Sequence, residues 1–92
     1  MLRLSPQQVA QADKMSRVQW SVAAAVAMLQ VVPEQVRLEM VLRGPEYFEG
    51  VARAELAGHA FHQSDYRRMF RIIQIRTTEP HRAISFAEME RL

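Results

Sequence analysis

A stretch without a helix breaker, residues 7–32, constrains the fold more than any other feature of the chain. It follows Ser5 and Pro6, which suit an N-cap and the first position of a helix. Apolar side chains recur in it at spacings of three and four residues, which places them on one stripe of a helix: Met15, Val18, Val22, Val26 and Leu29. The stretch predicts a helix that continues as far as Val31, and a kink near Ser16 can divide it in two.

Proline, glycine and serine separate the rest of the chain into shorter helices. Pro33 suits a helix start, and Gly44 followed by Pro45 suits the end of one helix and the start of the next. Ser64 and Ser85 can cap the last two helices. The predicted segments are 33–43, 45–58, 65–76 and 85–92.

Two local alternatives stay open. Residues 71–78 are β-branched and partly alternating, so they can form a strand instead of the end of a helix. In the second predicted helix, either Leu42 or Val41 joins Val36 and Met40 on the inward face.

The length and composition fit one small domain whose apolar surface can exceed what a single core can bury. The chain has 92 residues, 49% of them apolar, and its five helical segments with short connections predict an all-α fold over residues 1–92, a small single-domain helical bundle of about five helices. A chain this short and this apolar can carry more apolar surface than one core buries. We therefore expect a homo-oligomer that packs in part through the alanine- and valine-rich helix 18–31.

Several classes of protein are excluded or disfavoured. The chain has no cysteine, which removes disulfides and thiolate metal sites. Its most apolar run, from Val22 to Leu29, is shorter than the roughly 20 residues that span a bilayer. Its first residues lack the pattern of a signal peptide. We expect a cytoplasmic protein without a membrane contact.

One short segment gathers side chains that bind metals. On an unbroken helix Glu55, His59 and His62 share one face. Gly58 interrupts the set and weakens the helix, so we expect a joint between two helices here and no metal site. Three of the five serines suit N-caps or helix surfaces, and three glycines are too few for a phosphate-binding loop. The sequence predicts no enzyme, no catalytic residues and no cofactor.

Arginine dominates the basic residues, since Lys14 is the only lysine among twelve. Four arginines against one aspartate give residues 64–78 a net charge of +3. Arginine forks match carboxylates, and arginine is enriched in protein interfaces. Our leading hypothesis is a protein-binding module, an adaptor, regulator or inhibitor of a larger complex. The residues expected to contact the partner protein are Tyr66, Arg67, Arg68 and Arg71.

The alternative is a DNA-binding transcriptional regulator of the helix-turn-helix type, built from residues 7–26. Four residues fall roughly where that motif places its small, apolar, capping and core side chains: Ala10, Met15, Ser16 and Trp20. Arg17 and Gln19 would begin the recognition helix and, with Ser16, contact the nucleic acid. Lys14 departs from the glycine that is usual in the turn. DNA binding predicts an affinity that falls steeply with salt.

Overall fold

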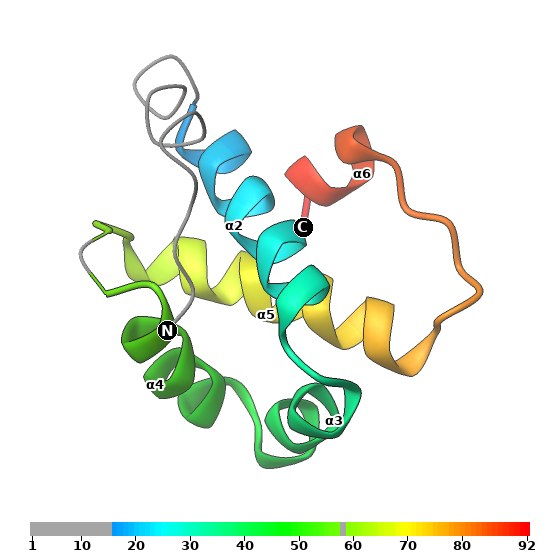
Figure 1. Cartoon of the computed structure of the whole chain (residues 1–92). Helices are drawn as coiled ribbons and strands as arrows, with labels where there is room; N and C mark the ends of the chain where they lie inside the picture. The colour runs from blue at the N-terminus through cyan, green and yellow to red at the C-terminus, as the bar shows by residue number, and fades with distance from the viewer. Residues whose placement is uncertain (1–15, 58) are drawn as a thin grey trace.

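The computed structural model describes residues 16–57 and 59–92, which form five helices and no strand. The helices are α2 (Arg17–Val31), α3 (Glu34–Arg43), α4 (Pro45–Glu55), α5 (Gln63–Thr78) and α6 (Phe86–Glu90) (Figure 1). The predicted all-α fold is confirmed. Residues 71–78 belong to α5, so the strand alternative for them is wrong. The part of the first predicted helix before Ser16 lies outside the described residues.

Serine side chains set the starts of α2 and α6. Ser16 Oγ accepts a hydrogen bond from the Gln19 N–H at 3.1 Å, and Gln19 Oε1 accepts one from the Ser16 N–H at 3.2 Å. This pair is a capping box, and it makes the predicted kink at Ser16 a helix start. Ser85 Oγ accepts from the Glu88 N–H at 3.1 Å, which confirms the predicted cap of the last helix.

A single residue, Gly44, joins α3 to α4. Its φ of 99° is one that residues with a side chain rarely adopt, and its N–H donates to the Met40 carbonyl at 3.0 Å. A Cβ added at Gly44 would meet nothing within 4 Å, so the backbone conformation and not the space requires glycine. Pro45 then opens α4, as the sequence predicts.

The core forms around α5, which runs behind α2 and also packs against α3 and α4 (Figure 1). The helix α5 contributes large apolar side chains, namely Tyr66, Met69, Phe70, Ile72, Ile73 and Ile75. The helix α2 contributes mostly small ones, namely Ser21, Val22, Ala24, Ala25, Ala27 and Met28. Small side chains let two helices approach closely. The alanine-rich face of α2 therefore packs against α5 within the chain. The homo-oligomer through residues 18–31 stays a prediction.

Some predicted details need correction. Leu42 is 87% exposed whereas Val41 is half-buried, so Val41 is the residue that accompanies Met40 inward. The helix α4 ends at Glu55 and not near residue 58. The helix α5 begins two residues before the predicted start, because the Asp65 carboxylate accepts from the His62 N–H at 2.8 Å and makes His62, not Ser64, the N-cap.

Phe48 tests the assigned core, because it is fully buried and its ring centroid lies 5.5 Å from that of Phe70. The Phe48→Ala substitution should lower the free energy of unfolding by about 3–5 kcal/mol, through lost burial and the cavity that it leaves. The exposed Leu42→Ala substitution is the control and should change it by less than about 0.5 kcal/mol. Chemical denaturation followed by circular dichroism measures both, and equal losses would contradict this core.

Candidate functional site

A buried carboxylate, Asp65, joins the first turns of α2 and α5. Asp65 is 1% exposed, and its Oδ2 accepts hydrogen bonds from Arg17 Nη2 at 2.6 Å and from the His62 N–H at 2.8 Å. Arg68 Nη1 lies 4.0 Å from Asp65 Oδ1 and donates to Ser21 Oγ at 3.3 Å. Two guanidinium groups and one backbone N–H thus compensate a charge that would be costly to bury alone.

We call Asp65, Arg17, Arg68 and Ser21 the Asp65 network. It contains one residue from each of the two predicted sites. Arg17, a predicted DNA contact, is half-exposed and bound to Asp65. Arg68, a predicted contact for a partner protein, is only 18% exposed at its side chain and reaches toward α2. Both arginines therefore stabilise the junction of α2 and α5.

The three DNA-contact candidates lie at the start of α2, as the helix-turn-helix hypothesis expects. Each of them also has a partner inside the chain, since Ser16 and Gln19 cap one another and Arg17 binds Asp65. The first half of the expected motif, residues 7–15, lies outside the described residues. DNA binding stays a prediction, and for it these three side chains would have to exchange their present partners.

The segment 56–62 joins α4 to α5, and it carries the two histidines that would share a face with Glu55 only on an unbroken helix. Because α4 ends at Glu55, His59 and His62 do not continue its face. The His59 ring meets the Trp20 ring edge-on with centroids 6.1 Å apart, and Trp20 stacks on Phe61 at 5.7 Å. In the described part of the chain, no group of three or more His, Cys, Asp or Glu side chains is arranged to hold a metal ion.

Two of the four predicted protein contacts, Arg67 and Arg71, are exposed on the outer side of α5. They are four residues apart, so they are neighbours on the helix surface. Arg71 Nη1 donates to Gln74 Oε1 at 2.7 Å, and among residues 16–57 and 59–92 neither arginine forms an ion pair. Tyr66, in contrast, is 4% exposed. We call Arg67 and Arg71 the outer arginine pair.

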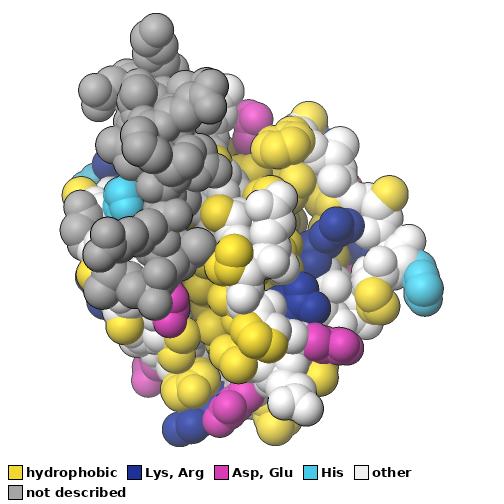
Figure 2. Space-filling model, in the orientation of Figure 1, with side chains coloured by type: hydrophobic (Ala, Val, Ile, Leu, Met, Phe, Trp, Pro, Cys, Tyr) yellow, Lys and Arg dark blue, Asp and Glu magenta, His cyan; other side chains and the backbone are white. Residues whose placement is uncertain are grey.

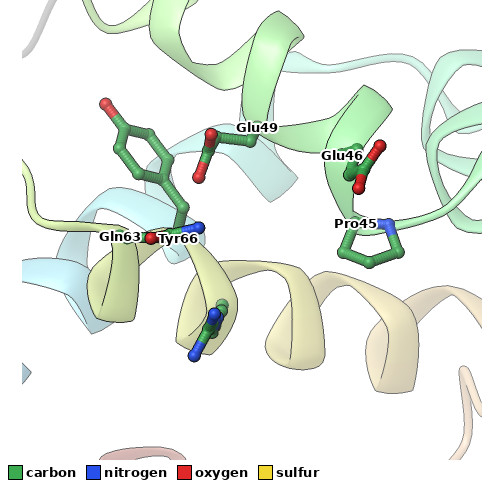
Figure 3. A pocket seen from close by; sticks show the side chains of 6 residues that line it. Pro45, Glu46, Glu49, Gln63 and Tyr66 are labelled. Atoms are coloured by element: carbon green, nitrogen blue, oxygen red, sulfur yellow. The ribbon is translucent and has the colours of Figure 1, made fainter.

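A pocket of about 210 Å³ lies beside the outer arginine pair, between the first turns of α4 and α5. Figure 3 shows Tyr66 standing up from α5 beside Glu49, with Glu46 and Pro45 nearer the start of α4. Glu49 also pairs with Arg53 at 3.5 Å. The surface next to Arg67 therefore carries acidic as well as basic groups, which suits contact with the mixed charges of a protein surface.

A second hollow, of about 610 Å³, was not predicted from the sequence. Its lining includes Arg37 of α3 and Arg76 of α5, together with apolar residues of α2 and α6. These residues come from four separate segments, so no local spacing in the sequence brings them together. The sequence shows only that Arg37 lies between Val36 and Leu38 and that Arg76 follows Ile75.

No family model, curated protein or solved structure matches the chain. None of the helices in the described ranges is both long and apolar enough to cross a membrane. The functional assignment therefore depends on the geometry of the two basic surfaces.

The Asp65 network is tested by Asp65→Asn, which keeps the shape of the side chain but removes the charge that Arg17 and Arg68 share. We expect the free energy of unfolding to fall by about 3 kcal/mol, because a buried ion pair loses one partner. The control is Glu39→Gln, which breaks an exposed pair with Arg43 and should cost less than about 1 kcal/mol. If urea denaturation showed equally small losses of unfolding free energy in both variants, the role given to Asp65 would be contradicted.

Tyr66 provides a test at alkaline pH. Burial raises the pKa of its phenol above the usual value; the Arg53 charge opposes this change, and the Glu49 and Asp65 charges add to it. The folded chain therefore holds this proton more tightly than the unfolded chain, and the stability gained is present below the ordinary tyrosine pKa of about 10. That stability is lost as the pH rises through the raised pKa.

The variant Tyr66→Phe should therefore lose less stability than the wild type when the pH rises above about 10. Urea denaturation at neutral and alkaline pH gives the free energy of unfolding of both proteins. If the free energy of unfolding depended on pH identically in the two proteins, the raised pKa of the Tyr66 phenol would be contradicted.

Proposed function

We propose that this chain is a small helical module that binds another protein, and that the outer arginine pair makes the central contact. The observation that carries the proposal is the exposure of two neighbouring guanidinium groups, with no ion pair to either of them among the described residues. Guanidinium groups bind carboxylates through two parallel hydrogen bonds. The favoured partner surface therefore presents aspartate or glutamate side chains.

The helix that carries the pair supports this role. The other side of α5 packs against α2, α3 and α4, so Arg67 and Arg71 project from a firmly held element. Arg68 anchors the same turn of α5 to α2. Tyr66, which lies beneath the surface against Phe61 with ring centroids 5.8 Å apart, fixes the first turn. We assign Tyr66 and Arg68 to positioning and the outer arginine pair to contact.

Exposed apolar side chains favour a protein over a nucleic acid as the partner. Leu38 and Leu42 lie four residues apart on α3 and are 48% and 87% exposed. Clustered apolar side chains on a surface mark places that a protein can cover. An adaptor, regulator or inhibitor of a larger complex would use such a surface by occupying its target. The lack of cysteine fits a cytoplasmic site of action as part of the same proposal.

The test is the double variant Arg67→Glu with Arg71→Glu, which reverses the charge of the outer arginine pair. Affinity for the partner that co-purifies from the native host should fall at least about tenfold, because like charges then oppose one another. Thermal unfolding should be unchanged, since both side chains are exposed. Sedimentation of the two proteins shows whether a second copy of the chain is itself a partner.

The matched control is Arg43→Glu with Arg91→Glu, which changes the net charge equally through two other exposed arginines. This control should keep its affinity. Equal losses in both double variants would show an effect of net charge alone, and unchanged binding by the first variant would remove the outer arginine pair from the interface.

A further inference from the structure

The larger hollow is lined by both apolar and polar side chains. It lies between α2, the C-terminal part of α5 and the segment that leads into α6, and it measures about 610 Å³. Val26 and Leu29 of α2 line one side, and Ile84, Phe86 and Met89 line the other. Figure 2 shows basic side chains gathered in a hollow between α2 and that segment, with hydrophobic side chains on both sides.

The hollow carries a positive charge that its own lining does not oppose. Arg37 and Arg76 line it, and no carboxylate does. Arg37 Nη1 donates to the Leu29 carbonyl at 3.3 Å, and Arg76 Nη1 donates to the Arg82 carbonyl at 3.4 Å. Arg37 Nε is buried without a hydrogen-bond partner. Both guanidinium groups therefore retain donors that suit a carboxylate.

Two acidic residues near this end of the molecule, Glu79 and Glu88, are already paired. Glu79 and Glu88 lie 3.3 Å and 2.7 Å from the guanidinium of Arg82. Arg82 thus compensates two carboxylates that would otherwise reduce the positive potential around Arg76. The charge of the hollow favours an anionic ligand.

We propose that this hollow binds an acidic, apolar segment of a partner protein. A carboxylate of the segment pairs with Arg37 and Arg76, and its apolar side chains cover Leu29 and Phe86, which is 61% exposed. Small-molecule sites enclose most of their ligand, whereas this hollow is open to solvent on one side. Two guanidinium groups beside apolar side chains also offer few contacts to a nucleic-acid backbone.

The inference rests on the proposed function in that the ligand is a protein, but it uses a surface distinct from the outer arginine pair. A library of short random peptides displayed on phage tests it without knowledge of the partner. The wild-type chain should enrich peptides in which aspartate or glutamate adjoins apolar residues. A synthetic copy of an enriched peptide should bind at least about tenfold more weakly to the double variant Arg37→Gln with Arg76→Gln, which lacks the charge pairing.

Two further variants separate the possible outcomes. Arg67→Gln with Arg71→Gln should bind the peptide as the wild type does, so a failure of this inference and a failure of the proposed function can be told apart. Phe86→Ala should weaken binding of the peptide. This variant keeps the hydrogen bond from Arg37 to the Leu29 carbonyl, so it tests the hollow even if the loss of that bond disturbs the fold of the arginine variant. Selection of neutral peptides only, or equal affinity for wild type, the Arg37 and Arg76 variant and Phe86→Ala, would overturn the inference.

Discussion

The buried carboxylate of Asp65 determines how the rest of the structure is arranged. A charge at 1% exposure is tolerable only while its partners stay in place, so the first turns of α2 and α5 cannot separate without exposing or orphaning it. The same carboxylate fixes where α5 begins, through the His62 N–H. It also draws Arg68 inward, and successive residues on a helix point about 100° apart. Arg67, one residue before Arg68, therefore points to another side of α5, and Arg71, four residues after Arg67, is exposed beside it.

The central helix α5 carries a member of both basic surfaces. Near its start Arg67 of the outer arginine pair lines a pocket with Glu46 and Glu49 of α4, so that surface is polar and mixed in charge. Near its end Arg76 stands among apolar side chains of α2 and α6, with Arg37 as its basic neighbour. The two surfaces therefore select different chemistry, one a set of exposed charges and the other a charge combined with apolar side chains. Under the proposed function, the two surfaces would contact a partner at two places.

Local signals in the sequence predicted the helix ends well where a residue acts on the backbone of its own turn. Ser16, Gly44, Pro45 and Ser85 have the roles that their residue types indicate. The local signals failed where a contact with a residue far away in the sequence determines the role of a side chain. Asp65 and Arg17 are 48 residues apart in the chain, and their pairing, which no spacing reveals, turned a predicted helix residue into the anchor of a network. The hollow around Arg37 and Arg76 also exists only after α2, α3, α5 and α6 have packed.

Gly44 has a consequence for how the two surfaces relate. Because one residue serves as both the end of α3 and the beginning of α4, only its two backbone torsions separate the helices, and its φ of 99° holds them at a defined corner. The helix α3 carries Arg37 into the hollow, and α4 carries Glu46 and Glu49 beside Arg67. The conformation of this one residue therefore sets the angle between the helix that lines the hollow and the helix beside Arg67.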